Sequence, residues 1–161
     1  MAKQLPLRPN VCMLVFNREG KLFLGERAGK GGCWQFPQGG VESQISLEEN
    51  VFKELGEELG LKRKQIGRLV KLTATHSYDW DKVPGYAKGK WRGQAQTFWL
   101  IEFIGEDKNI DLCADEEQEL QSWKWCTPEQ VRKLAEAKRL PGYEAALLEF
   151  EELVREGGLD G

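Results

Sequence analysis

The sequence lacks any apolar run long enough to cross a membrane. Its longest runs, such as residues 11–16, are far shorter than the roughly 20 residues that a membrane-spanning helix requires. Residues 1–9 also contain no apolar block of the length that a secretory signal needs. We therefore expect a protein that has no membrane contact and is located in the cytoplasm.

Cysteine and histidine are scarce, which argues against several kinds of site. The chain has four cysteines and one histidine. The cysteines are widely spaced with no C-x-x-C pair, so we expect reduced thiols rather than a disulfide framework or a cysteine-based zinc site. Because no cysteine or second histidine accompanies His76, we interpret it as a packed or hydrogen-bonded side chain.

An excess of positive charge is also missing, since the formal net charge is −3. We therefore expect no role as a scaffold on duplex nucleic acid, and any nucleotide contact should be local. Residues 82–92 are the exception, because they contain basic side chains and no acid, and they include Tyr86 and Trp91. Such a segment can contact phosphates and stack on a base, with Trp80 as a further stacking surface. The alternative is a solvated loop whose lysines discourage strand pairing.

Length and composition predict one domain over residues 1–161. Runs rich in β-branched and aromatic residues predict strands, and apolar residues at helical spacing predict helices. We expect strands over residues 11–16, 21–27, 34–36, 67–78, 94–104 and 120–126, and helices over residues 47–59, 128–138 and from 143 to near 157–158, the last two separated by Leu140-Pro141-Gly142. The two longest strands should pair with each other. This order predicts an α/β fold of the α+β type, an α/β/α sandwich with a mixed β-sheet between helices.

The helix expected over residues 47–59 has clear start and stop signals. Ser46 and Glu49 form a capping box, in which the Ser46 side chain caps the first amides and Glu49 bonds back to the Ser46 amide. Gly60 supplies a left-handed cap at the other end. Apolar residues spaced by four form a stripe that should be buried.

Glu54, Glu57 and Glu58 lie at positions i, i+3 and i+4 of this helix and therefore share one face. Like charges at these spacings destabilise a helix by roughly 0.2–0.5 kcal/mol per pair. We infer that this face binds a cation, and hard divalent cations with oxygen ligands fit best. The alternative is a charged outer face, which is the usual position of paired acids on helices.

A substrate with phosphate oxygens would complete the ligand shell of such an ion, so a polyphosphate is the expected substrate. A bound divalent ion would neutralise charge on the leaving phosphate and help to deprotonate an attacking water. Gly39 and Gly40 open a turn before the helix and allow the backbone to approach the site closely.

The same spacing resembles the signature of the Nudix hydrolases. That signature is Gly, five residues, Glu, seven residues, then Arg-Glu-aliphatic-any-Glu-Glu-any-Gly-aliphatic. Laid from Gly39, it fits throughout to residue 61 and departs at two positions, Ile45 and Lys53. Outside this box, residues 8–11, 34–40, 93–96 and 122–125 resemble the branch of RNA pyrophosphohydrolases and dinucleoside polyphosphate hydrolases, so the resemblance covers most of the chain.

The resemblance implies an enzyme that uses Mg²⁺ or Mn²⁺ to cleave a phosphoanhydride with water. The substrate would be a 5′-triphosphate RNA end, with release of pyrophosphate, or a dinucleoside polyphosphate. By the same resemblance, the metal ligands would be Glu54, Glu57 and Glu58 with the backbone at Gly39, the 5′ phosphates would contact Arg8 and Arg27, and Glu119 would be a further catalytic acid, with Glu116 and Glu117 as substitutes. As the general base, Glu57 and Glu119 both remain open.

The two departures from the signature concern the support of the metal face. In the family, the first box glutamate pairs with the box arginine and holds the loop against the helix. Here both partners have changed, to Ile45 and Lys53. A lysine is a flexible point charge that can pair with another acid, such as Glu42. We therefore predict a rearranged support with catalysis retained.

Two further departures concern the substrate. Ala95 and Thr97 stand where the branch often has lysines near the phosphates, so phosphate binding would rely instead on Lys88, Lys90 or Arg92. No aromatic residue at 138–140 corresponds to the one that some RNA-processing members place against the first base. The alternatives are therefore a nucleotide or nucleotide-sugar pyrophosphatase and a non-catalytic nucleotide-binding or regulatory module. The sequence does not indicate an oligomeric state.

Overall fold

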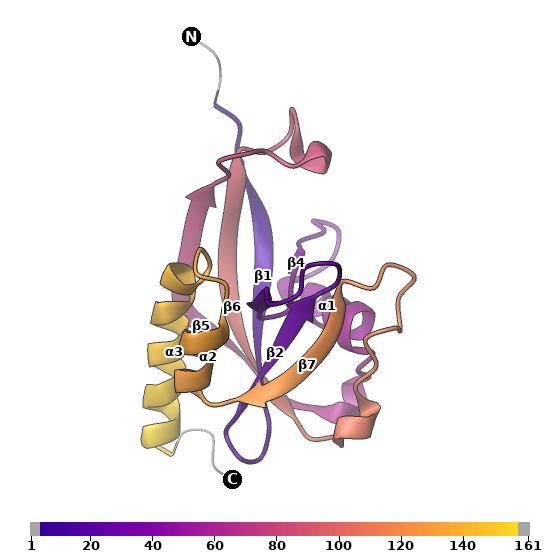
Figure 1. The fold of residues 1–161 in the computed structure, drawn as a ribbon, viewed down its shortest axis with the longest axis vertical. Helices are drawn as coiled ribbons and strands as arrows, with labels where there is room; N and C mark the ends of the chain where they lie inside the picture. Colours follow the sequence, from indigo (N-terminus) through magenta and orange to yellow (C-terminus); the bar gives the residue numbers. More distant parts are fainter. Residues whose placement is uncertain (1–3, 158–161) are drawn as a thin grey trace.

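The computed structural model describes residues 4–157, which form one mixed β-sheet with helices on both faces (Figure 1). The strands are β1 (Leu7–Phe16), β2 (Leu22–Arg27), β3 (Trp34–Gln35), β4 (Gln38–Gly40), β5 (Ile66–Asp79), β6 (Gly93–Phe103) and β7 (Leu120–Cys126). The helices are α1 (Leu47–Leu59), α2 (Pro128–Leu134) and α3 (Leu140–Arg155). Within the described range, no helix is both long enough and apolar enough to cross a membrane.

Strand β1 is the centre of the sheet. It pairs in parallel with β6 along its whole length, from Leu7 opposite Gly93 to Phe16 opposite Glu102. It pairs antiparallel with β2 and β4. Strand β5 is antiparallel to β6, which confirms the predicted pairing of the two longest strands, and β7 is antiparallel to β2. The mixture of parallel and antiparallel neighbours confirms the mixed sheet.

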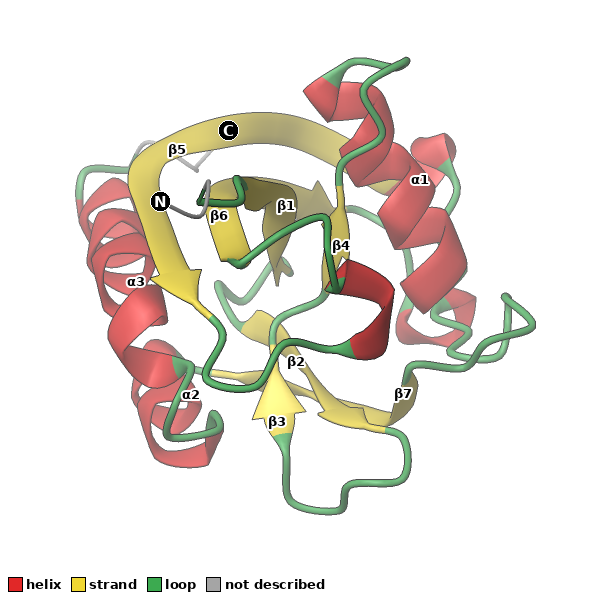
Figure 2. Ribbon diagram, turned by 90° about the horizontal axis from the view of Figure 1, so that it is seen from above, coloured by secondary structure: helices red, strands yellow, loops and turns green. Residues whose placement is uncertain are grey.

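The two faces of β1 are buried by different helices, because successive side chains of a strand point to opposite faces. One core lies between the sheet and helices α2 and α3, and the other lies between the sheet and α1. Figure 2 shows α1 on one side of the sheet and α2 and α3 on the other. This arrangement confirms the predicted α/β/α sandwich. The first core takes Cys12, Leu14 and Phe16 from β1, and the second takes Val11, Met13 and Val15.

Helix α1 begins and ends as predicted, apart from one contact. The Ser46 side chain accepts from the Glu49 amide, and Gly60 adopts a left-handed conformation with φ of 68°. The Glu49 carboxylate does not bond back to the Ser46 amide, however, because it pairs with Arg63 beyond the end of the helix. The N-terminus of the helix is therefore capped by the Ser46 side chain without the reciprocal Glu49 contact.

The structure corrects the prediction that Gly39 and Gly40 form a turn. They belong to strand β4, where Gly39 lies opposite Val11 and Gly40 opposite Asn10 on β1. This pairing fixes the backbone of both glycines at the edge of the sheet next to α1. The turn into the helix comes later, over residues 41–46.

The predicted helix over residues 128–138 is shorter in the structure, because α2 ends at Leu134. Ala135 forms a bridge with Trp34, and the Glu136 amide donates to the Trp34 carbonyl (3.0 Å). These contacts with β3 draw the chain out of the helix and place residues 136–139 beside the sheet.

Helix α3 begins earlier than predicted, at Leu140, and ends at Arg155. Pro141 and Gly142 lie in its first turn, where a proline is tolerated because the missing N–H needs no partner there. A Cβ at Gly142 would lie 2.4 Å from Cδ2 of His76 on β5, so the His76 ring is packed against the helix. Residue 158, near which we expected the helix to end, lies outside the described residues.

Gly142→Ala is expected to destabilise the protein, because the new methyl group would overlap the His76 ring. Overpacking of this kind costs about 1–3 kcal/mol, which should appear as a lower midpoint in chemical denaturation. Gly85→Ala is the matched control, since a Cβ there would meet no described atom within 4 Å. Equal stability of the two variants would contradict the close approach.

Candidate active site

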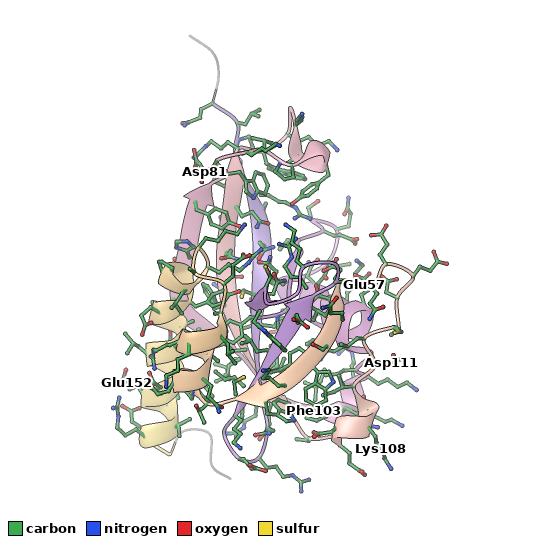
Figure 3. All side chains as sticks on the ribbon, viewed as in Figure 1. Glu57, Asp81, Phe103, Lys108, Asp111 and Glu152 are labelled. Atoms are coloured by element: carbon green, nitrogen blue, oxygen red, sulfur yellow. The ribbon has the colours of Figure 1, made fainter. Side chains whose placement is uncertain are left out.

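A cavity of about 570 Å³ lies where α1, β4 and the start of β1 meet the loop that precedes β7. Figure 3 shows Glu57 beside the start of β7, which Glu119 directly precedes. The cavity brings together residues that are far apart in the sequence. Six of the predicted site residues line it, namely Arg8, Arg27, Gly39, Glu54, Glu57 and Glu119, and so does Glu117.

The acidic side of the cavity comes from α1. Glu54 is 8% exposed and Glu58 is 5% exposed, whereas Glu57 is half-buried. Burial raises the pKa of Glu54 to about 7, and the Glu57 carboxylate adds to the rise. Gly39 lies directly on this group, because a Cβ there would be 2.1 Å from Cδ of Glu54. Only a glycine leaves room for that contact.

Glu58 is the most deeply buried of the three acids, and the burial of its carboxylate is the least compensated by hydrogen bonds. Burial raises its pKa well above the usual range, and the Glu119 carboxyl beside it raises it further. Glu119 and the backbone of Gln38 lie next to Glu58, but both of its side-chain oxygens lack a well-formed hydrogen bond to any described residue. Two buried acceptors without donors are costly unless something positive binds there.

Lys53 confirms the predicted change of partner. Its Nζ lies 3.2 Å from Oε1 of Glu42 and 2.9 Å from Oε1 of Glu57. The Glu57 carboxylate, followed by that of Glu42, raises the pKa of Lys53 above its ordinary value. The lysine thus connects the loop before α1 with one of the acids that line the cavity.

These residues fit a divalent cation by their chemistry. The site offers closely spaced carboxylates, unpartnered buried oxygens on Glu58, and a glycine backbone against Glu54, all of which suit a hard cation. In the described part of the chain, no three histidine, cysteine or acidic side chains are already gathered around one point. Glu57 is paired with Lys53 in this arrangement.

The lining of the cavity also includes the cations Arg8, Arg27 and Arg139. The Arg8 guanidinium carbon lies 5.0 Å from the Tyr86 ring centre and 5.5 Å from the Trp91 ring centre. Its Nη1 donates to Oε1 of Gln94 (3.3 Å). A Cβ at Gly40 would be 2.1 Å from Nη2 of Arg8, so the side chain lies flat on β4. Arg8 is thereby held at the cavity with donors left for an anion.

The structure does not bring the other predicted phosphate ligands to this cavity. Lys88 and Lys90 are exposed and are not among the residues that line it. Arg92 donates to the Leu5 carbonyl (2.8 Å) and forms an ion pair with Asp79. From the basic segment, only Tyr86 lines the cavity, so the segment contributes an aromatic ring rather than a cation.

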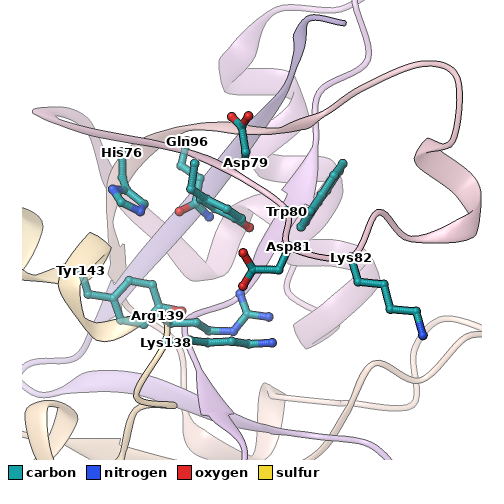
Figure 4. Close-up of a pocket in the computed structure, with 10 residues that line it drawn as sticks. His76, Asp79, Trp80, Asp81, Lys82, Gln96, Lys138, Arg139 and Tyr143 are labelled. Atoms are coloured by element: carbon teal, nitrogen blue, oxygen red, sulfur yellow. The ribbon is translucent and has the colours of Figure 1, made fainter. Parts of the chain in front are cut away.

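A second cavity, of about 440 Å³, adjoins the first at Arg139, which lines both. Figure 4 shows Arg139 and Asp81 pointing toward one another across it. Trp80, one of the two predicted stacking surfaces, lines this cavity, whereas Trp91 packs against Arg8. The remaining residues that line it include His76, Tyr78, Lys82, Gln96, Lys138 and Tyr143.

Two kinds of site residue were missed by the sequence interpretation. Arg139 lies in the connection between α2 and α3 and is oriented by Glu136, whose Oε1 accepts from its Nε (3.1 Å). Nothing local distinguishes it from other arginines. The second kind is a set of buried amides. Gln94 and Gln96 alternate on β6, a spacing that places both on one face and could have revealed them. Their side chains bond to Asn10, Gln38 and Tyr78 beside the cavity.

Comparisons with known proteins agree with this geometry. A family model described as the NUDIX domain matches residues 6–146. An RNA pyrophosphohydrolase of Novosphingobium aromaticivorans is 34% identical over 154 residues, covering 93% of this chain and 96% of the relative. One from Sphingopyxis alaskensis is 33% identical over 154 residues, covering 94% and 97%. The solved binary complex of a C. elegans Ap4A hydrolase has a similar fold, with a TM-score of 0.63, 18% identity and coverage of 91% and 98%.

Proposed function

The chain belongs to the Nudix hydrolase family, and we propose that it is a divalent-metal-dependent pyrophosphohydrolase that acts on 5′-triphosphate RNA ends. The observation that carries the proposal is the composition of the first cavity. Glu54, Glu57 and Glu119 line it together with Arg8 and Arg27. Glu58, whose buried oxygens are unpartnered, lies next to Glu119. A polyphosphate with a bound cation has the complementary distribution of charge. The RNA pyrophosphohydrolase relatives support the RNA end as the substrate.

Glu54, Glu57 and Glu58, together with the backbone at Gly39, would hold Mg²⁺ or Mn²⁺. When bound, the ion would neutralise charge on the substrate's phosphate oxygens and make an attacking water more acidic. The chain contributes the position of these ligands. Glu54 is buried against the Gly39 backbone, and Glu58 is buried next to Glu119 and the backbone of Gln38.

In the proposed reaction, a water oxygen attacks one of the two phosphorus atoms of the α–β phosphoanhydride, and the bond from that phosphorus to the oxygen bridging the α and β phosphates breaks. The products are a 5′-monophosphate RNA end and pyrophosphate. The water proton passes to a carboxylate, for which Glu57 and Glu119 are the candidates because both line the cavity. The phosphate oxygens are bound by Arg8, Arg27 and Arg139, and these contacts orient the 5′ polyphosphate for attack.

A dinucleoside polyphosphate is the second candidate substrate. The observation that favours it is the pair of adjoining cavities that share Arg139. Trp80 and Tyr78 in the second cavity offer aromatic surfaces for a base. The fold resembles that of the C. elegans Ap4A hydrolase, which supports testing this substrate class beside RNA.

The experiment that tests the proposal compares triphosphorylated RNA with diadenosine tetraphosphate, each with Mg²⁺, with Mn²⁺ and with a chelator. We expect metal-dependent release of pyrophosphate from the RNA. Turnover that persists in the chelator would contradict the metal dependence. Absence of turnover on both substrates would favour the regulatory alternative, and cleavage of nucleotide sugars in the same assay would favour the alternative pyrophosphatase.

Arg139→Gln is expected to weaken substrate binding, because it removes the cation shared by the two cavities while keeping a polar side chain. A hydrogen bond to a charged group contributes about 1.5–3 kcal/mol, which corresponds to roughly a 10- to 100-fold rise in KM. Steady-state kinetics on triphosphorylated RNA measures the change. Arg132→Gln is the matched control, since Arg132 pairs with acids of α2 and α3 and lines neither cavity. A KM within twofold of wild type for Arg139→Gln would remove this residue from the binding site.

A further inference from the structure

The loop over residues 41–46 joins β4 to α1 and is largely exposed to solvent. It is fixed at its start by the Val41 amide, which donates to the Pro9 carbonyl (3.1 Å), and at its end by the cap at Ser46. Because β4 carries the Gly39 backbone that lies on Glu54, the conformation of this loop affects the position of a proposed metal ligand.

Between these two ends, one buried side chain holds the loop. Asn50, in the first turns of α1, is 1% exposed. Its Oδ1 accepts from the Glu42 amide (2.8 Å). Its Nδ2 donates to the carbonyls of Ser46 (2.9 Å), Glu42 (3.1 Å) and Ile45 (3.4 Å). The side-chain amide of Asn50 therefore bonds to both backbone groups of Glu42, its N–H and its carbonyl. It also bonds to the carbonyls of Ile45 and Ser46.

These contacts require both halves of the amide. An aspartate could accept from the Glu42 N–H but could not donate to the three carbonyls, and it would bring a charge into a buried position. An alanine would leave all four backbone groups without this partner. Asparagine is also less favourable than alanine inside a helix, so its presence here costs local stability that the loop contacts offset.

The same loop lacks the side-chain pair that the family signature would place there. Ile45 is 37% exposed and cannot pair with a cation, and Lys53 pairs with Glu42 and Glu57. Asn50 and Lys53 thus both attach to Glu42, one through its backbone and the other through its carboxylate. Glu42 is the common point of attachment between the loop and α1.

We propose that Asn50 is a positioning residue that, alongside the Lys53–Glu42 ion pair, holds the loop in place of the signature pair absent at positions 45 and 53, and so keeps Gly39 against Glu54. The importance of this role for turnover rests on the proposed function, but the role itself is a property of the chain. Groups that orient metal ligands typically contribute 10- to 100-fold to metal affinity or activity.

The first test is made on the metal-free protein by amide hydrogen exchange. In Asn50→Ala, the Glu42 amide loses its acceptor and is expected to exchange about two- to tenfold faster, the factor that corresponds to one hydrogen bond. The Glu49 amide, capped by Ser46, should not change more than twofold. Asn17→Ala is the matched control, because Asn17 accepts from the amides of Glu19 and Lys21 in the β1–β2 turn and lines neither cavity.

The second test measures Mn²⁺ binding by calorimetry and turnover of triphosphorylated RNA. Asn50→Ala is expected to bind Mn²⁺ about 10- to 100-fold more weakly than wild type, while Asn17→Ala binds it normally. Adding Ile45→Glu and Lys53→Arg to Asn50→Ala restores the glutamate–arginine pair of the Nudix signature, which can then hold the loop. This triple variant should recover at least half of the lost Mn²⁺ affinity on a logarithmic scale. In wild type, the same two changes should leave turnover within a few-fold.

Two results would overturn the proposal. One is unchanged exchange at Glu42 with Mn²⁺ affinity within twofold of wild type, and the other is failure of the Ile45→Glu and Lys53→Arg changes to recover any affinity. If Asn50→Ala does not fold, Asn50→Asp takes its place in the Mn²⁺ measurement and its rescue by Ile45→Glu and Lys53→Arg. It keeps the acceptor for the Glu42 amide, so the exchange test does not apply to it, and it replaces the donors with a buried charge. Wild-type protein that binds Mn²⁺ without turnover would refute the proposed function and leave the role of Asn50 measurable.

Discussion

Glu57→Gln is expected to slow pyrophosphate release from triphosphorylated RNA by about 10²- to 10⁴-fold, the range over which a positioned acid or base contributes to a reaction. Glutamine keeps the size of the side chain but removes its charge and its ability to take up a proton. Lys53 retains its pair with Glu42, so the loop before α1 stays attached. Because Glu57 is half-buried at the cavity wall, the thermal midpoint should change little.

Glu48→Gln is the control for this prediction, since Glu48 lies in the first turn of the same helix, is exposed, and does not line the cavity. Its rate should equal that of wild type. Glu119→Gln, measured in the same assay over a range of pH, separates the two candidate bases. A general base acts only when it is deprotonated, so the variant that lacks the base should lose the fall in rate at acidic pH, whereas the other variant should keep it. A loss of less than threefold in Glu57→Gln would exclude Glu57 from the chemistry.

Gly39→Ala is expected to reduce turnover by about 10²-fold, since misplacement of a catalytic group by about 1 Å can cost that much. The new Cβ would lie 2.1 Å from Cδ of Glu54 and 2.3 Å from its Oε2. Glu54 is 8% exposed and has little space into which it can move, so its carboxylate must leave its present position. Gly39 does not have a positive φ, so the effect is steric rather than a consequence of backbone strain.

Two other glycines serve as controls for this substitution. Gly31→Ala should have wild-type kinetics, because a Cβ there would meet no described atom within 4 Å. Gly40→Ala would meet the Arg8 guanidinium, which is the end of a flexible side chain, so it should raise KM more than it lowers kcat. Equal kcat values for Gly39→Ala and Gly40→Ala would contradict the specific contact between Gly39 and Glu54.

The helix that carries the acids could be predicted from the sequence because its signals are local. The Ser46 cap and the Gly60 cap are formed by residues within one turn of the helix ends, and the spacing of Glu54, Glu57 and Glu58 fixes their shared face. The prediction failed where a distant partner competed. Glu49 bonds to Arg63 instead of the Ser46 amide, and Gly39 pairs with β1 instead of turning.

The cationic side of the site was predicted less well, for a related reason. Arg8 and Arg27 came from a resemblance, and both line the cavity. Lys88, Lys90 and Arg92 were chosen because they are basic and close to aromatic residues in the sequence, but position in a segment does not determine which way a side chain points. In the fold, Arg92 pairs with Asp79, and the two lysines remain outside the cavity.

The sequence by itself determined the acidic helix, its caps at Ser46 and Gly60, the apolar run over residues 11–16 that becomes part of β1, and the family to which the chain belongs. These features depend on residues within a few positions of one another or on a fixed spacing. The tertiary structure alone decided that Arg139 joins two cavities and that Asn50 holds the loop beside Gly39. Both depend on how segments pack against each other, and the energy of such contacts is set by partners that the local sequence does not specify.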